Sequence, residues 1–223
     1  MNGQDSVSGV QVTACALLSK QMYELACAFT ADMLQGKPLE SKTFSVATAL
    51  PLAAVILAHA SLEAYLNEFL NLREHMDPQK WAAAISELRR ASIQSKWALA
   101  AQLFGGKSFD KAGEPYQSFS LLVTLRNELI HYDPGFRPLG TFPSKTIEAL
   151  NIKFPFEYPG KTDWTVQVLN PKCAKWVCGT VRAMISKFHE LVGDPDLTAL
   201  PPIGLRHRRR ATLPPKRGEG HKP

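Results

Sequence analysis

Apolar residues recur every three or four positions in five stretches of the chain, a spacing typical of amphipathic helices. The stretches cover residues 10–34, 48–75, 77–104, 115–132 and 170–193. Asp77-Pro78 and Asn170-Pro171 are signals that begin helices, and Gly193 is a signal that ends one. The pattern predicts an all-α fold, an up-and-down bundle of about five helices.

Residues 133–169 follow a different pattern, with five prolines and six large aromatic side chains. This segment is too aromatic for a disordered linker, and Ile152–Phe156 and Trp164–Leu169 alternate enough to predict a short hairpin. We predict an ordered insertion packed on a helical domain that spans residues 1–195. Residues 196–223 lack periodicity and are predicted to be a disordered basic tail.

The net charge of +6 comes entirely from residues 201–223, which carry seven basic side chains and one acidic side chain. The rest of the chain is formally neutral, so its charge does not indicate a basic nucleic-acid binder. The four cysteines form no C-x-x-C pair, and none lies at zinc-ligand spacing from a histidine. Together with the lack of a signal-peptide pattern at the N-terminus, this favours a cytoplasmic protein without a metal or other cofactor.

No formal charge lies between Lys42 and Glu63, so this segment resembles a membrane span. Pro51, His59 and many alanines make it a poor span, and the helical pattern continues beyond Glu63. We interpret it as a buried core helix whose first turn contains Pro51, and we expect no membrane partner.

The fourth helical stretch ends in a cluster of polar side chains, Arg126-Asn127-Glu128-Leu129-Ile130-His131. At 100° per residue, the core side holds Leu121, Leu122, Leu125, Leu129 and Tyr132, and the opposite side holds Val123, Arg126, Asn127 and Ile130. Arg126 and His131 lie about 140° apart, so they cannot pair within one helix. Apolar residues beside a polar cluster indicate an interface rather than open solvent.

Arg126, Asn127 and His131 together suit the cleavage of a phosphodiester. Arginine supplies a planar charge for phosphate oxygens, the amide donates hydrogen bonds or fixes the histidine, and imidazole titrates near neutral pH. Exposed carbonyls at a helix end favour a protonated histidine, which suits a general acid. Without a carboxylate cluster for magnesium, metal-free cleavage of RNA through its 2′-OH is the economical reaction.

A second polar series, formed by His59, Glu63 and Asn67, recurs every four residues in an otherwise apolar helix. Glu63 or Asn67 would support Arg126 or His131 if the two helices pack together. A solvated stripe or a buried hydrogen-bond network is the more common role for such a series. We expect His75 and His189 to be surface residues.

The segment Leu125-Arg126-Asn127-Glu128-Leu129-Ile130-His131-Tyr132 resembles the R-N-x-x-x-H signature of HEPN domains. These are all-helical modules found in many prokaryotic ribonuclease toxins and defence proteins. Leu57–Phe69 is similar to the earlier HEPN helix that carries a polar residue facing the site. The likeness covers Val10–Tyr132 and the last helix, and leaves residues 133–169 unmatched.

The resemblance implies a homodimer in which two copies of the motif face each other. Arg126 and His131 would then be catalytic, Asn127 would assist them, and Glu63 would be a weaker supporting residue. It also implies an RNA substrate and allows an antitoxin protein as a partner. Two functions remain open: a metal-independent endoribonuclease, and a non-catalytic HEPN-like module that uses the same face for dimerisation or partner binding. Arginine and histidine in a last helical turn are also ordinary capping residues.

Overall fold

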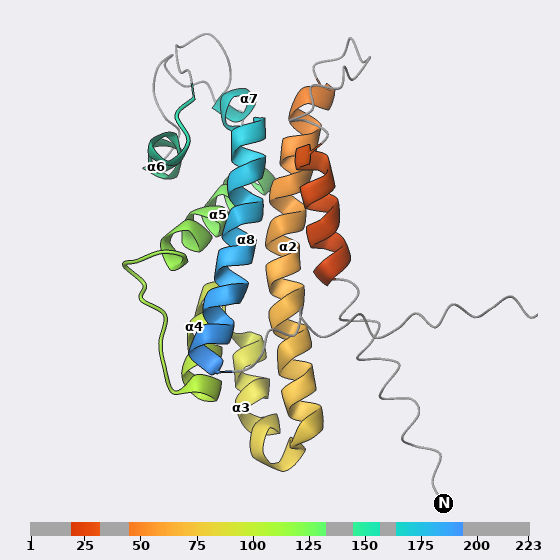
Figure 1. Ribbon diagram of the computed structural model, residues 1–223, viewed down its shortest axis with the longest axis vertical. Coiled ribbons are helices and arrows are strands. Elements are labelled where there is room, and N and C mark those ends of the chain that lie inside the picture. The colour runs from red at the N-terminus through yellow and green to blue at the C-terminus, as the bar shows by residue number, and fades with distance from the viewer. Residues whose placement is uncertain (1–18, 32–44, 133–144, 157–163, 194–223) are drawn as a thin grey trace, which may run out of the picture.

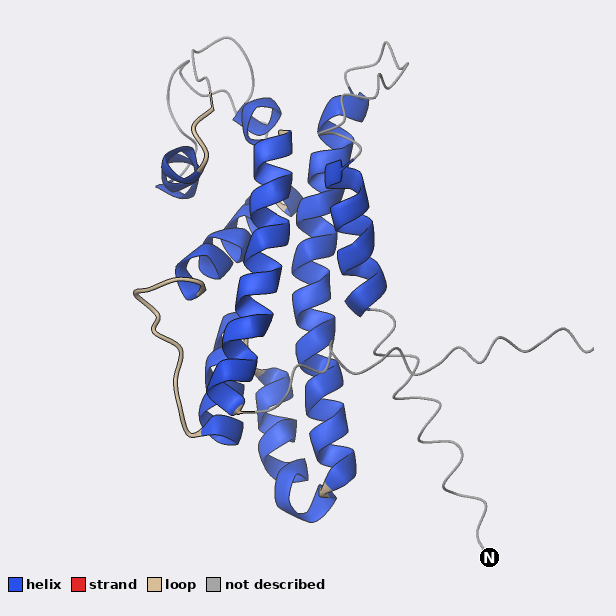
Figure 2. Cartoon of the chain, viewed as in Figure 1, coloured by secondary structure: helices blue, strands red, loops and turns tan. Residues whose placement is uncertain are grey.

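The computed structural model describes residues 19–31, 45–132, 145–156 and 164–193, and these residues form helices and contain no strand (Figure 2). A helical segment at residues 19–31 comes first. The helices that follow are α2 (Ser45–Met76), α3 (Pro78–Arg90), α4 (Ile93–Gly105), α5 (Tyr116–Ile130), α6 (Lys145–Lys153), α7 (Trp164–Val168) and α8 (Pro171–Val192). The predicted all-α fold is confirmed.

The two longest helices, α2 and α8, lie side by side and run in the same direction (Figure 1). Between them and α4 lies an aromatic core, in which Tyr65 stacks on Trp97 with ring centroids 6.2 Å apart and Phe188 meets Trp97 edge-on at 5.2 Å. These rings are buried, and they join three helices that are far apart in the sequence. They therefore hold the bundle together through long-range apolar contacts.

The buried histidine in this core corrects one expectation from the sequence. His189 on α8 is only 7% exposed, and its Nε2 atom shares a short hydrogen bond with the Tyr65 hydroxyl on α2. A buried imidazole is tolerated because the phenol satisfies one ring nitrogen. His75, at the end of α2, is exposed as expected.

Residues 19–31 run antiparallel to α2, as Figure 1 shows. The Ser19 hydroxyl and backbone N–H both donate to the Glu68 carboxylate, at 2.6 and 3.2 Å. Burial nevertheless raises the pKa of Glu68, although both hydrogen bonds oppose the rise. At its other end the segment reaches α8, where the Thr30 hydroxyl lies 3.6 Å from the Cys178 sulfur.

The predicted third helix is divided into two. α3 ends at Arg90, and Ser92 then caps α4 by accepting a hydrogen bond from the Ser95 N–H at 3.2 Å. The prediction of one continuous helix was wrong because the apolar spacing continues across the break, whereas the cap depends on a single serine.

The predicted hairpin in the insertion was also wrong. Ile152 belongs to the end of α6, and Trp164–Val168 forms the single-turn helix α7. The described parts of the insertion pack on the bundle as expected, with Ile147 and Leu150 fully buried on α6. An alternation of apolar and polar residues over five positions fits both a strand and a short helix with one buried side, so it could not distinguish the two.

The other helix ends agree closely with the sequence signals. Asn170 caps α8 by accepting hydrogen bonds from the N–H groups of Lys172 and Cys173. Gly193 ends the same helix in the left-handed conformation, with φ of 73°. α2 begins three residues before the predicted start, so Pro51 lies in its second turn rather than its first.

Within α2, the stretch Ala49–Met76 is long and apolar enough to cross a membrane by length and composition alone. Central helices of bundles have the same properties, and half of its most apolar window is buried inside the protein. Ala54, Val55, Ala58 and Leu62 are fully buried, as the interpretation of a core helix requires. The absence of a membrane partner remains a prediction.

Candidate functional site at the end of α5

The candidate residues lie where α5 passes behind α8 and ends beside α2 (Figure 1). Leu122 and Leu125 anchor this helix in the core, where both are fully buried. The three predicted catalytic residues follow in the last turn and at the end of the helix. Arg126 is half-buried, and Asn127 and His131 are exposed.

Two neighbours of the cluster differ from the helical-wheel prediction. Val123 is only 7% exposed, whereas it was placed opposite the core; Tyr132, placed on the core side, is 40% exposed. α5 contacts α2, α6 and α8, so the buried part of its circumference is wider than one apolar stripe. Tyr132 comes two residues after the last helical residue and lies against Trp164, with ring centroids 6.2 Å apart. Ile130 is 46% exposed, as predicted.

Arg126 and Asn127 interact directly although they are neighbours in sequence. The guanidinium Nη1 donates to the Asn127 Oδ1 at 3.0 Å. This contact orients the guanidinium and leaves its other N–H groups for another acceptor. The amide thus holds the Arg126 guanidinium in place, and the assisting role of Asn127 in catalysis stays a prediction.

His59 on α2 is 7% exposed, and it is near enough to Arg126 for the arginine charge to act on it. Burial lowers its pKa below the ordinary histidine value, and the nearby Arg126 charge lowers it further, whereas Glu63 opposes the change. His59 is therefore a neutral imidazole at neutral pH. It does not compete with Arg126 for an anion, and it adds no repulsion to the guanidinium.

The position of His59 beside Arg126 was not predicted. The polar series on this helix was recognised, but the support was assigned to Glu63 and Asn67. An available signal was that His59 is flanked by Ala58 and Ala60, two small residues that allow another helix to approach. α5 is one of the helices that contact α2.

Glu63 and Asn67 differ in how close they come to the cluster. Glu63 is exposed one turn after His59, and its charge acts on that imidazole. Asn67 is half-buried two turns beyond His59, about 12 Å along the helix axis. None of the hydrogen bonds found among the described residues connects Asn67 to Arg126.

His131 stands apart from the other members. It is the C-cap of α5, and its backbone N–H donates to the Asn127 carbonyl at 2.9 Å. Within the described part of the chain, no side-chain hydrogen bond joins His131 to Arg126. One chain thus presents an oriented arginine and, about 140° around the helix, an exposed imidazole that faces elsewhere.

No group of three or more His, Cys, Asp or Glu side chains comes together at metal-binding distances among the residues that the structure describes. The exposed end of α5 carries an arginine, an amide and the imidazole of His131, a set suited to binding an anion. Comparisons with protein-family models, with curated proteins and with solved structures give no match for this chain. The resemblance to HEPN domains therefore rests on the two quoted segments.

Proposed function

We propose that the protein is a metal-independent endoribonuclease of the HEPN type, acting as a toxin or defence effector. The observation that carries the proposal is the exposed end of α5, where Arg126 is held by Asn127 beside a neutral His59. The guanidinium would bind phosphate oxygens and stabilise the charge that grows on them during cleavage.

In the proposed reaction, the ribose 2′-oxygen attacks the adjacent phosphorus and the bond from phosphorus to the 5′-oxygen breaks. His131 donates a proton to the leaving 5′-oxygen and recovers one from the 2′-OH, so the step is balanced. The products are a 2′,3′-cyclic phosphate and a 5′-hydroxyl. DNA lacks the attacking hydroxyl and is not a substrate.

The proposed active unit is a homodimer. Arg126 and His131 of one chain face different directions, so an imidazole from a second chain completes the site more readily than its own does. Ile130 is exposed between them and supplies an apolar contact for such an interface. An antitoxin would then cover the same face.

The test measures RNA cleavage and growth arrest for the wild type, Arg126→Ala and His131→Ala. We expect each substitution to slow cleavage by about 100-fold or more, because each removes a charge-stabilising or proton-transferring group. Arg90→Ala and His75→Ala serve as controls, since both side chains are of the same type and lie at other helix ends. Cleavage must also survive EDTA, and equal rates for all five proteins would refute the proposal.

The exposed Ile130 also favours the second candidate, a non-catalytic module that dimerises or binds a partner through this face. Ile130→Glu separates the two functions when oligomeric state and cleavage are measured together. Loss of both the dimer and cleavage supports the nuclease. A wild-type dimer that Ile130→Glu dissociates, but that cleaves no RNA, supports the binding module.

A further inference from the structure

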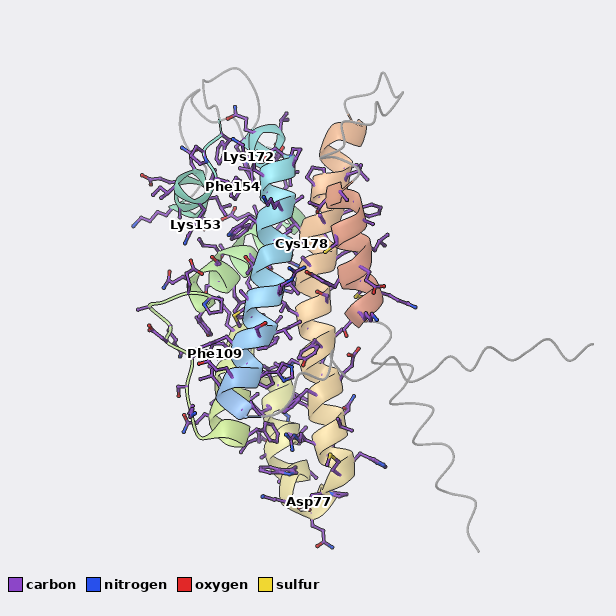
Figure 3. All side chains as sticks on the ribbon, in the orientation of Figure 1. Asp77, Phe109, Lys153, Phe154, Lys172 and Cys178 are labelled. Carbon is purple, nitrogen blue, oxygen red and sulfur yellow. The ribbon has the colours of Figure 1, made fainter. Side chains whose placement is uncertain are left out.

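A groove of about 670 Å³ opens at the beginning of α5, at the opposite end of this helix from Arg126. Its walls come from α5, the end of α6 and the first half of α8, and Phe154, Pro155 and Trp176 give it an apolar, aromatic lining. Figure 3 places Lys153 and Phe154 beside Lys172, where α6 approaches the beginning of α8.

Lysines around the groove leave it with unbalanced positive charge. Lys153 forms an ion pair with Glu114. Partial burial would raise the pKa of Glu114, but Lys153 and the Ser118 hydroxyl hold it below its usual value, so this carboxylate stays charged. Lys172 uses one N–H on the Pro155 carbonyl at 3.3 Å, and the exposed Lys175 makes none of the hydrogen bonds or ion pairs recorded in the described part of the chain. Two ammonium groups thus remain for an anionic ligand.

Gly179 has no side chain, so nothing projects into the groove from this position on α8. It lies inside α8, where glycine costs roughly 0.5–1 kcal/mol relative to alanine. A Cβ atom added there would meet nothing within 4 Å, so no packing contact in the described structure requires a glycine. The open space at Gly179 leaves room for a ligand to approach the α8 backbone closely.

We propose that this groove binds a stretch of single-stranded RNA, as a second contact for the substrate of the endoribonuclease proposed above, on which the inference rests. Aromatic rings stack on bases and lysines hold the phosphates, the combination used by sequence-tolerant single-strand binders. The hydroxyls in the groove are already engaged, because Ser118 donates to Glu114 and Thr180 donates to the Trp176 carbonyl. Neither hydroxyl proton is therefore available to donate to a base edge.

The groove and the candidate site lie on one helix. Ser118 and Arg126 are eight residues apart on α5, about 12 Å along its axis. A strand of a few nucleotides is long enough to span that axial separation. The groove would fix the strand while the scissile phosphate lies at Arg126.

The probe is a fluorescent 2′-O-methyl oligouridylate, which cannot be cleaved through a 2′-OH, and its anisotropy is measured with the full chain at several salt concentrations. We expect Lys172→Gln/Lys175→Gln to bind at least tenfold more weakly. Its slope of log affinity against log salt should be smaller by about 1.4, because two phosphate contacts on a single strand are lost. Lys80→Gln/Lys107→Gln, which removes two lysines at the far end of the bundle, should bind like the wild type.

A second pair of variants tests whether binding of the probe depends on the open shape of the groove. Gly179→Phe should fill the groove and weaken binding, whereas Gly179→Ala should bind normally. Thermal unfolding of both proteins checks that each is folded. Unchanged affinity and salt slope in Lys172→Gln/Lys175→Gln would overturn the proposal. The proposal would also be overturned if the wild type does not bind the probe but binds a peptide rich in glutamate and phenylalanine, and if Gly179→Phe abolishes that peptide binding.

Failure of this inference is distinguishable from failure of the nuclease proposal. Cleavage of ordinary RNA that depends on Arg126, with normal probe binding by Lys172→Gln/Lys175→Gln, refutes the groove alone. Groove-dependent probe binding by a wild type that never cleaves RNA refutes the nuclease alone.

Discussion

At the scale of single residues, the most informative interaction is the electrostatic one between Arg126 and His59 of the polar series on α2. Arg126 was expected to work with His131 of a second chain, since the two residues lie about 140° apart on one helix. Within one chain, Arg126 donates to Asn127, and its charge acts on the buried His59 of α2. A neutral imidazole is a suitable neighbour for an arginine that must keep its charge available, and burial ensures that neutrality.

The buried His59 predicts acid sensitivity of the fold. Its pKa is lower in the folded protein than the ordinary value of about 6.5. As the pH falls below that value, the unfolded chain binds a proton that the folded protein still rejects, so the free energy of unfolding decreases. The loss stops once the pH passes the lower, folded pKa, and it cannot exceed about 1.4 kcal/mol per pH unit.

Urea unfolding of the wild type and His59→Gln between pH 7.5 and 5 measures this effect. We expect a shallower loss of stability in the variant, since glutamine does not titrate. Glu63→Gln provides the matched opposite case, because removing the charge that raises the His59 pKa should extend the wild-type loss to lower pH. Parallel pH profiles for the wild type and His59→Gln would show that His59 does not behave as a buried neutral group.

At the scale of helices, two glycines have opposite surroundings. Gly105 ends α4 against the last turn of α8, where an added Cβ would fall on the Leu191 carbonyl and lie 2.8 Å from the Val192 Cα. Gly179 faces the open groove. The close approach of two backbones explains the first glycine and cannot explain the second.

Substitution by alanine should therefore have opposite effects at these two positions. Gly105→Ala should destabilise the protein by about 1–3 kcal/mol, because backbone atoms must move to admit the methyl group. Gly179→Ala should stabilise it by about 0.5–1 kcal/mol through helix propensity alone. Thermal or urea unfolding of the two variants checks both signs, and destabilisation by Gly179→Ala would mean that the position has a packing role.

The helices could be predicted where side-chain chemistry is local. Asn170 and Gly193 mark the ends of α8 because a cap and a left-handed glycine depend only on neighbouring residues. The break at Ser92 and the identity of α7 could not be predicted, since their apolar positions fit more than one structure. The same limit explains the candidate site: the Arg126–His131 cluster is a local pattern, whereas the approach of His59 depends on how α2 and α5 pack.

At the scale of the whole molecule, the course of α5 through the bundle determines how the candidate site is assembled. Its beginning helps to form the aromatic groove, its middle is buried, and Arg126 and His131 at its end are about 140° apart by helical geometry. The correction at Val123 removes one of the two apolar residues that favoured an interface, so Ile130 now supports it alone. The composite site therefore needs a test that depends on which chain supplies each residue, and not only on whether a dimer forms.

Mixing inactive variants provides that test. Arg126→Ala and His131→Ala should each be inactive alone, but a mixed dimer of the two contains one site with an intact Arg126 from one chain and an intact His131 from the other. After subunit exchange the mixture should recover about a quarter of the wild-type rate, because half of the dimers are mixed and each has one of two sites intact. Mixing Arg126→Ala with the double variant Arg126→Ala/His131→Ala restores no site and is the control. If each chain instead formed its own complete site, the two single variants would stay inactive after mixing, since neither chain in any dimer would have both residues.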